Sequence, residues 1–318
     1  MIDVVPSSAA QCVMPTALRG VFPVLATPFN ADLSPDEQGL RAIARYAIDA
    51  GADGIVYPGV ASEYDTLTMD ERLHLVDVVA AVAHDRVPLV VGASASDVGA
   101  TEALMRHAAE LGADAVMVMA PKTSATSVDA IAFFRRVASA GNVPIMLQNA
   151  PPPAGSGLPV DVVLDAVRAV PEIAYVKEES LPSGARISRL IANAPPTLRG
   201  VLGGAGGRYI TDEIARGAVG TMPAVELVEL HAALFLAHRA GDRAAVRRWF
   251  NRMLPLLNMQ VAFRWSLTKE VLRRRGIIEH AAKRAAGPEL DSGDHAELTE
   301  LLAELSDVLD PPVVRGAP

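Results

Sequence analysis

One lysine, Lys177, stands at the carboxyl end of a short apolar run, Ile173-Ala174-Tyr175-Val176, and the pair Glu178-Glu179 follows it. The run is typical of a buried strand. In a parallel barrel the carboxyl end of such a strand faces the catalytic mouth, where a partly desolvated lysine can lose its proton and attack a carbonyl group. The plainer interpretation is a lysine that pairs with the glutamates beside it. The residue types therefore predict either a nucleophile or an ordinary ion pair.

Polar residues follow three further apolar runs. The turn 59–64, Gly-Val-Ala-Ser-Glu-Tyr, could present backbone N–H groups and the Ser62 hydroxyl to a carboxylate. It could equally be an ordinary turn that caps the helix expected from Thr68. Lys122 follows a second run, and Gln148 ends a third at a position equivalent to that of Lys177. We expect Gln148 either to hydrogen-bond a ligand or to satisfy neighbouring backbone groups.

A glycine cluster, Gly203-Gly204-Ala205-Gly206-Gly207, lies after another apolar run. Glycines at this place in a barrel can cradle a phosphate, or they can merely let another part of the chain approach closely. No two histidines have a metal-ligand spacing, and the sequence contains neither a Gly-x-Ser-x-Gly elbow nor a Walker motif. The sequence therefore predicts a site without a metal ion.

The elements that must position these residues are eight short apolar runs, which alternate with amphipathic stretches. The runs lack hydrophobic-polar alternation, so they are typical of strands buried on both faces. Eight such strands alternating with helices predict a (β/α)8 TIM barrel, with a doubly wound open sheet as the alternative. The runs are residues 21–27, 54–57, 89–92, 115–119, 144–148, 173–177, 198–202 and 219–222, and clear helical stretches include 35–50, 69–83, 98–111 and 128–140.

Further helical patterns continue beyond the eighth unit, at residues 242–257, 262–275 and 294–309. We expect them to form additional C-terminal helices outside the barrel. The predicted organisation is an N-terminal segment at 1–18, the barrel at 19–240, a helical lobe at 241–310 and a loose tail at 311–318, which is rich in proline.

Composition excludes several classes of protein. The chain has 318 residues, 50% of them hydrophobic, and a formal charge of -8 with no basic face apart from Arg273-Arg274-Arg275, so we expect no nucleic-acid partner. No window reaches the length of a membrane span, and residues 1–15 do not read as a targeting signal. The single cysteine, Cys12, excludes an intramolecular disulfide. These features predict a cytoplasmic protein.

Five segments, in their order and spacing, carry a family resemblance. They are Gly20-Val21-Phe22-Pro23 to Thr27-Pro28-Phe29, the stretch 54–68 with Ser62-Glu63 and Leu67-Thr68, Gln148-Asn149-Ala150-Pro151, Val176-Lys177-Glu178 and Gly217-Ala218-Val219-Gly220. Together they resemble the class I aldolase and dehydratase family that includes dihydrodipicolinate synthase and N-acetylneuraminate lyase. The resemblance implies a homo-oligomer, a dimer or a tetramer made of dimers. It also implies that Lys177 forms a covalent Schiff base with a small 2-oxo acid such as pyruvate, without a cofactor.

The chain departs from this family pattern where substrate and protons are handled. Val60 and Ala61 have no hydroxyl, although relatives usually have serine or threonine there to bind the substrate carboxylate. Gln148 stands where those relatives have a tyrosine, and Lys122 and Thr123 stand where they have others. Both changes argue against dihydrodipicolinate synthase itself, because that reaction moves protons through these phenols.

The Ser-Glu turn, the Gln-Asn-Ala-Pro segment and Gly276-Ile277-Ile278 look more like the sugar-acid dehydratase branch that includes 2-keto-3-deoxy-L-arabonate dehydratase. We therefore hypothesise dehydration of a 2-keto-3-deoxy sugar acid through a lysine iminium and enamine. A pyruvate-releasing retro-aldolase and a non-catalytic oxo-acid sensor are the alternatives. Candidate catalytic residues are Lys177, Ser62, Glu63, Lys122 and Tyr64, with Tyr57 as another phenol; candidate substrate-binding residues are Val60, Ala61, Ser62, Gln148, Gly203 and Gly204.

Overall fold

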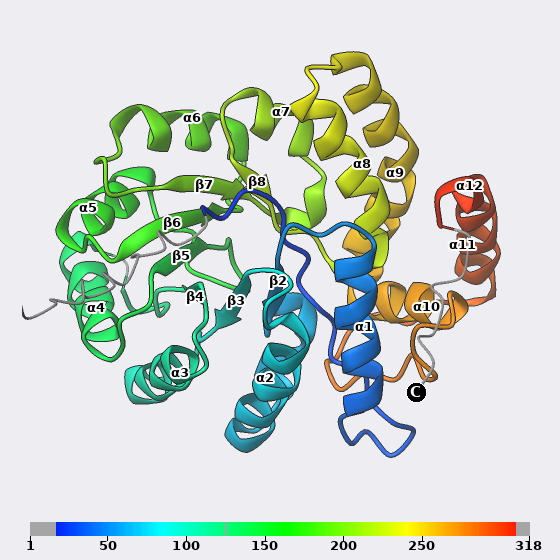
Figure 1. Cartoon of the computed structure of the whole chain (residues 1–318), viewed down its shortest axis with the longest axis horizontal. Helices are drawn as coiled ribbons and strands as arrows, with labels where there is room; N and C mark the ends of the chain where they lie inside the picture. Colours follow the sequence, from blue (N-terminus) through cyan, green and yellow to red (C-terminus); the bar gives the residue numbers. More distant parts are fainter. Residues whose placement is uncertain (1–16, 125, 310–318) are drawn as a thin grey trace, which may run out of the picture.

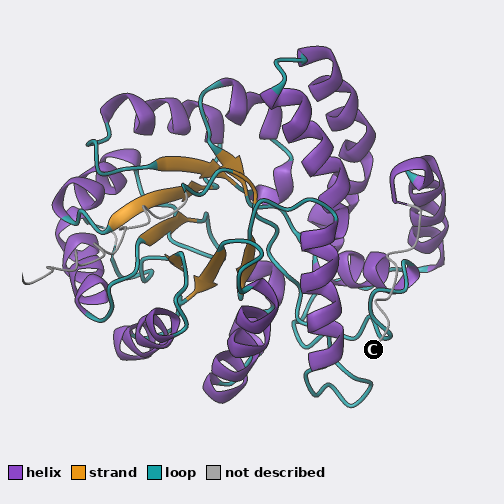
Figure 2. Ribbon diagram, viewed as in Figure 1, coloured by secondary structure: helices purple, strands orange, loops and turns teal. Residues whose placement is uncertain are grey.

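The computed structural model describes residues 17–124 and 126–309, which form an eight-stranded parallel sheet surrounded by helices (Figures 1 and 2). Neighbouring strands pair in the order β1-β8-β7-β6-β5-β4-β3-β2. The strands are β1 (Gly20–Val21), β2 (Ile55–Tyr57), β3 (Leu89–Gly92), β4 (Ala115–Val118), β5 (Ile145–Asn149), β6 (Ile173–Glu178), β7 (Gly200–Gly203) and β8 (Gly220–Thr221).

The sheet closes into a barrel through the chain that follows β1. Val24 forms parallel bridges both to Val56 in β2 and to Ala224 beyond β8, and backbone hydrogen bonds from Leu25 to Val56 and from Val56 to Pro23 support the closure. The predicted TIM barrel is thus confirmed, with all eight strands overlapping the expected runs. An open doubly wound sheet is excluded by the closure.

Helices follow the strands and pack around the outside of the sheet (Figure 2). Their starts match local sequence signals: the Asp36 side chain caps α1 at the Gly39 N–H, and Thr68 and Glu71 form a capping box at α2. The barrel helices are α1 (Glu37–Asp49), α2 (Met69–Ala83), α3 (Val98–Glu110), α4 (Ser127–Ser139), α5 (Val160–Ala169), α6 (Ser183–Asn193), α7 (Ile210–Ala215) and α8 (Val228–Arg239).

Four more helices continue the chain: α9 (Arg243–Phe263), α10 (Trp265–Arg274), α11 (Ser292–Glu304) and α12 (Ser306–Leu309). α9 packs along α8, and α11 and α12 lie at the edge of the molecule (Figure 1). Arg275, directly after α10, joins these C-terminal helices to the barrel: it pairs with Glu229 of α8 and stacks on Tyr46 of α1. The expected N-terminal segment, apart from its last two residues, and the expected tail at 311–318 lie outside the described residues.

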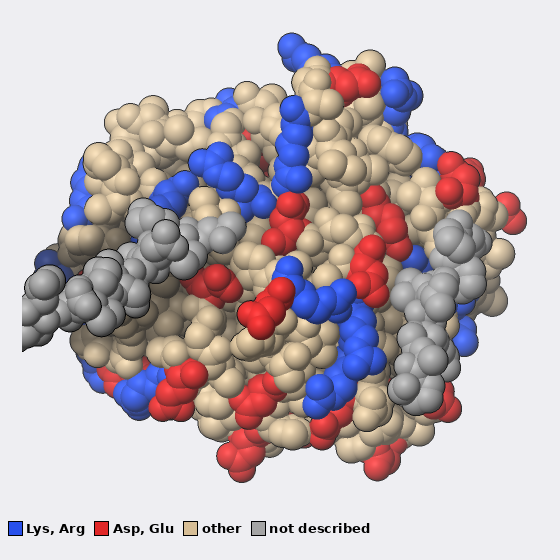
Figure 3. Space-filling model, viewed as in Figure 1, with Lys and Arg blue, Asp and Glu red and all other residues tan. Residues whose placement is uncertain are grey.

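Side-chain direction in the strands separates two cores. One residue set fills the barrel interior, including Val90, Met117, Met146 and Tyr175, whereas alternate residues pack against the surrounding helices. Inside residues 17–124 and 126–309, no helix has the length and hydropathy needed to span a bilayer. On the face in Figure 3, acidic and basic side chains are interspersed. The cytoplasmic location and the homo-oligomer stay predictions.

Substitution of Gly92, at the end of β3, tests how closely this strand end packs against its neighbours. A Cβ atom at this position would lie 1.7 Å from the backbone carbonyl oxygen of Pro58, which cannot rotate away. We expect Gly92→Ala to lower the free energy of unfolding by about 1–3 kcal/mol, the usual cost of overpacking a core, in chemical denaturation. The control is Gly99→Ala in the exposed first turn of α3, where alanine should be neutral or slightly stabilising. Equal stability of the two variants would contradict this account.

Candidate active site

Lys177 points into the mouth of the barrel from the end of β6. Tyr175, two residues earlier, packs in the barrel interior, and the period of two in a strand places Lys177 on the same face. Val176 and Glu178 point the opposite way, toward the helices, where Glu178 pairs with Arg186. The lysine side chain is buried, with 4% of its surface exposed. Its amine is therefore largely removed from water, and its role as a nucleophile stays a prediction.

Glu179, just beyond β6, is the nearest charged partner of that amine. The Lys177 Nζ lies 3.3 Å from Glu179 Oε1. The Gln148 amide donates a hydrogen bond to Glu179 Oε2 at 2.7 Å, and the Ala205 N–H donates to Oε1 at 3.1 Å. Burial alone raises the pKa of Glu179, but the Lys177 charge and these hydrogen bonds outweigh it and hold the pKa below the ordinary glutamate value. Glu179 is therefore ionised at neutral pH.

The glycine cluster after β7 wraps around this carboxylate. A Cβ atom on Gly204 would lie 2.5 Å from Glu179 Oε1, and one on Gly203 would lie 1.9 Å from Glu213 Oε2. The cradle that sequence reasoning assigned to substrate or phosphate is thus already occupied by protein carboxylates. Ala205 and Gly206 border the cavity described next, whereas Gly203 and Gly204 do not.

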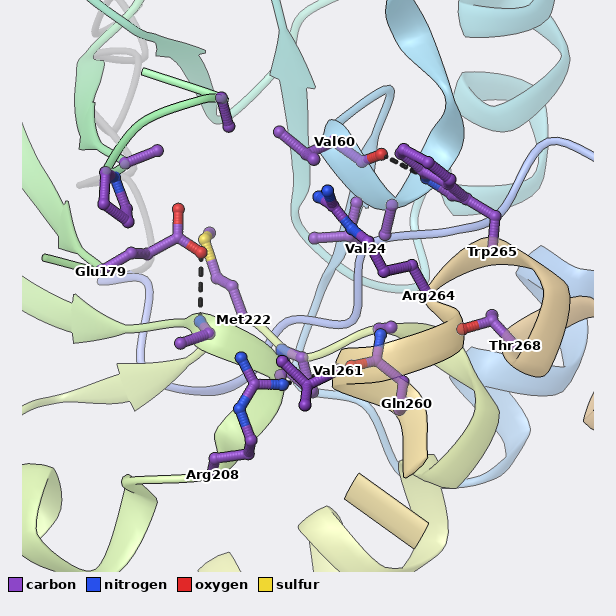
Figure 4. A pocket seen from close by; sticks show the side chains of 18 of the residues that line it. Val24, Val60, Glu179, Arg208, Met222, Gln260, Val261, Arg264, Trp265 and Thr268 are labelled. Atoms are coloured by element: carbon purple, nitrogen blue, oxygen red, sulfur yellow. Dashed lines mark hydrogen bonds between the residues drawn. The ribbon is translucent and has the colours of Figure 1, made fainter. Parts of the chain in front are cut away.

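A cavity of about 340 Å³ opens above Lys177, at the low end of the range for small-ligand sites (Figure 4). Its wall comes from the ends of strands and from the junction of α9 and α10. No phenol lines it within the described part of the chain. The lining groups that can carry charge or donate hydrogen bonds are Lys177, Glu179, Arg208, Gln260, Arg264, Trp265 and Thr268.

The turn after β2 contributes its backbone and small side chains to the cavity. Val60 and Ala61 line it, whereas Ser62 does not. The Ser62 hydroxyl is fully buried, donates a hydrogen bond to the Leu25 carbonyl and accepts one from the Gly59 N–H. Its hydroxyl therefore fastens the turn to the barrel, and the expected contact with a substrate carboxylate is not supported.

Glu63 likewise has a structural role, since it is buried in an ion pair. Its backbone is left-handed, with φ 56°, and its side chain is fully buried away from the cavity. The carboxylate pairs with Lys269 of α10 and accepts hydrogen bonds from the N–H groups of Arg284 and Ala285. This buried ion pair replaces the expected role of Glu63 in proton transfer.

The remaining candidates lie outside the Lys177 cavity. Tyr64 and the exposed Lys122 line a neighbouring cavity of about 850 Å³, and the Tyr64 ring faces the Arg72 guanidinium at 5.3 Å. Tyr57 is fully buried and hydrogen-bonds Thr27, and burial raises its pKa. The structure thus brings Lys177, Gln148, Val60 and Ala61 around one site and places the other predicted catalytic residues elsewhere.

Sequence reasoning missed three charged side chains of this site. Glu179 was treated only as a neighbour of Lys177, although its place beyond the strand end was a usable signal. Arg208 was seen only as the residue after the glycine cluster. Arg264 lies inside a continuous helical pattern and carries no local signal of its role.

Comparisons with known proteins agree with this fold. The model of the dihydrodipicolinate synthetase family matches residues 17–305. The chain is 32% identical to a 4-hydroxy-tetrahydrodipicolinate synthase of Acidobacterium capsulatum, over 93% of this chain and 98% of that protein. It is 29% identical to an L-2-keto-3-deoxyarabonate dehydratase of Azospirillum brasilense, over 94% and 97% respectively. The structure of a dihydrodipicolinate synthase from Rhodopseudomonas palustris superposes with a TM-score of 0.84 and 25% identity, over 92% of this chain and 99% of that one.

The Glu63–Lys269 pair can be tested by stability measurements. Glu63→Gln keeps an acceptor for the two N–H groups but leaves the Lys269 charge buried without a counter-ion. We expect it to lower the free energy of unfolding by about 3–5 kcal/mol, the usual cost of breaking a buried pair. The double variant Glu63→Gln/Lys269→Met should be more stable than the single variant because the unpaired charge is gone. A single variant as stable as the unaltered protein would disprove the structural role.

Proposed function

Because the chain belongs to the dihydrodipicolinate synthetase family, whose members are lyases, we propose that it dehydrates a 2-keto-3-deoxy sugar acid through a Schiff base on Lys177. The observation that carries the proposal is the buried Lys177 amine beside the ionised Glu179, in a cavity of small-ligand size. An amine and a carboxylate at this distance can form an iminium and move a proton next to it.

In the first step Lys177 passes a proton to Glu179 and its amine attacks the C2 carbonyl of the substrate. Glu179 returns this proton to the former carbonyl oxygen, which leaves as water, so that a positively charged iminium remains. The iminium draws electrons from C3, so the C3 proton passes to Glu179 and the C–H electrons form an enamine. The enamine then expels the C4 hydroxyl, which leaves as water with the proton from Glu179. Hydrolysis of the unsaturated iminium consumes one water and frees Lys177. This water offsets the one lost when the iminium formed, so the net change is loss of one water from C3 and C4.

The environment of Glu179 suits both halves of this proton transfer. Burial is the largest influence on its pKa and raises it, whereas the positive charge on the nitrogen of Lys177 lowers it. While the iminium is charged, Glu179 is ionised and can accept the C3 proton. When the iminium becomes a neutral enamine, the lowering by the positive charge is removed while the hydrogen bonds from Gln148 and Ala205 remain, so the pKa of Glu179 rises. The proton then stays on Glu179 until the C4 hydroxyl takes it.

The composition of the cavity supports dehydration over dihydrodipicolinate synthesis. Relatives that perform the latter reaction carry tyrosines at positions held here by Gln148, Lys122 and Thr123, and no phenol lines the cavity among residues 17–124 and 126–309. The Azospirillum brasilense relative, which is named L-2-keto-3-deoxyarabonate dehydratase, gives this activity a precedent among proteins similar to this chain.

Borohydride trapping tests the Schiff base directly. Incubation with pyruvate and sodium borohydride should add one carboxyethyl group to the protein, and peptide mass spectrometry should place it on Lys177. Lys177→Ala should show no adduct. An unmodified Lys177 after incubation with pyruvate would rule out the mechanism. A panel of 2-keto-3-deoxy acids then separates dehydration, whose unsaturated product tautomerises to a 2-oxoacid semialdehyde, from retro-aldol cleavage, which yields pyruvate.

Glu179→Gln tests the proton carrier without requiring the natural substrate. Exchange of the pyruvate methyl protons with D2O, followed by NMR, reports proton removal at C3. We expect the variant to slow this exchange by roughly 10²- to 10⁴-fold, the usual contribution of a general base, while the borohydride adduct on Lys177 still forms. Glu172→Gln, an exposed glutamate at the opposite end of β6, is the matched control and should exchange normally. Normal exchange by Glu179→Gln would remove Glu179 from the mechanism.

A further inference from the structure

Two arginines from different elements reach the Lys177 cavity. Arg208 precedes α7, and Arg264 lies between α9 and α10; both side chains extend toward the cavity in Figure 4. In the described part of the chain, neither guanidinium forms an ion pair; Arg208 donates to the Gln260 side chain at 3.3 Å. Arg275 and Arg284, by contrast, pair with Glu229 and Glu71. The two cavity arginines are therefore available to an anionic ligand.

The position of Arg264 is fixed by an unusual backbone and by an aromatic support. Its φ of 48° and ψ of -113° are unfavourable for any residue with a side chain, and such strain concentrates at ligand sites. The guanidinium lies 4.5 Å from the ring centroid of Trp265. The Trp265 indole N–H in turn donates to the Val60 carbonyl at 2.8 Å. The turn after β2 thus fixes the Trp265 ring that contacts the Arg264 guanidinium.

The charges that line the cavity do not balance. Three cations, Lys177, Arg208 and Arg264, face one carboxylate, Glu179, which leaves a formal excess of two positive charges. A 2-oxo acid with one carboxylate compensates only one of them. The turn that carries hydroxyls in relatives offers none here, since Val60 and Ala61 are aliphatic and the Ser62 hydroxyl is engaged by Leu25 and Gly59.

The two arginines border the Lys177 cavity in different ways. Arg208 is close enough to Glu179 for the two charges to interact, and it is also within reach of the Arg264 charge. Arg264 and Trp265 border both this cavity and the neighbouring one, whereas Arg208 borders only the first, so Arg264 lies where the two cavities meet. An extended ligand bound covalently at Lys177 would present its first carboxylate to Arg208 and its far end to Arg264.

We propose that Arg264 selects a 2-oxo acid that carries a second anionic group, a carboxylate or a phosphate, at the end remote from the ketone. Arg208 binds the carboxylate next to the ketone. This inference rests on the proposed Schiff base at Lys177 and specifies the substrate class of the same site. Each charge-assisted contact is of the kind that anion-recognising arginines make in proteins.

Matched 2-oxo acids test the proposal through the concentration at which borohydride trapping of Lys177 is half complete. 2-Oxoglutarate and 2-oxoadipate carry a terminal carboxylate, whereas 2-oxopentanoate and 2-oxohexanoate have the same chain lengths without it. We expect at least one dianion to trap at roughly 10- to 100-fold lower concentration than its monoanionic partner. Arg264→Gln should abolish this preference and leave the monoanions unchanged, while Arg208→Gln should weaken trapping by all four acids.

Arg247→Gln, an exposed arginine on α9, is the control and should retain the preference. A five-carbon 2-oxo acid with a terminal phosphonate separates the two kinds of second anionic group. If the group is a phosphate, this acid should trap at a lower concentration than 2-oxoglutarate; if it is a carboxylate, 2-oxoglutarate should trap at the lower concentration. No preference for a dianion at either length, or equal weakening of all acids by Arg264→Gln, would overturn the inference while leaving the Schiff base intact. Failure of pyruvate to label Lys177 would instead overturn the proposed function itself.

Discussion

One buried carboxylate, that of Glu63, joins the barrel to the helices that follow it. It receives the Lys269 ammonium of α10 and the N–H groups of Arg284 and Ala285, so a single side chain in the turn after β2 fixes two segments more than 200 residues away. A charge removed from water demands such complete compensation. The same turn accepts the Trp265 hydrogen bond at Val60, and the α9–α10 junction is thereby placed over the mouth.

The site is consequently shared between the barrel and the C-terminal helices. The strands supply Lys177 and Gln148 from the ends of β6 and β5, which rigid hydrogen-bonded neighbours hold in register. The α9–α10 junction supplies Arg264, whose strained backbone requires both flanking helices to be anchored. The proposed chemistry thus lies on hydrogen-bonded strands, and the proposed recognition of the rest of the substrate lies on a segment whose position depends on the Glu63 contacts.

The barrel and Lys177 could be predicted from the sequence because both depend on local pattern: apolar runs of strand length, and an amine at the end of one of them. The period of two along β6 even fixes the direction of Lys177. The roles of Glu63 and Arg264 could not be predicted in this way. Glu63 lies in a left-handed turn whose side-chain direction no periodicity gives, and its partners are remote in sequence. Glutamate beside serine in a turn resembled a catalytic pair because spacing alone does not reveal burial.

Gln148 and Glu179 are best understood together. Where the family resemblance places a tyrosine, the Gln148 amide has no proton to release at neutral pH, so it cannot take over a phenol's work. It donates instead to Glu179, and with the Ala205 N–H it holds the carboxylate beside the Lys177 amine. A carboxylate already ionised at neutral pH needs no further base to activate it, unlike a phenol. In the proposed mechanism the glutamine and the glutamate therefore act together: Gln148 fixes the carboxylate, and Glu179 removes the C3 proton directly.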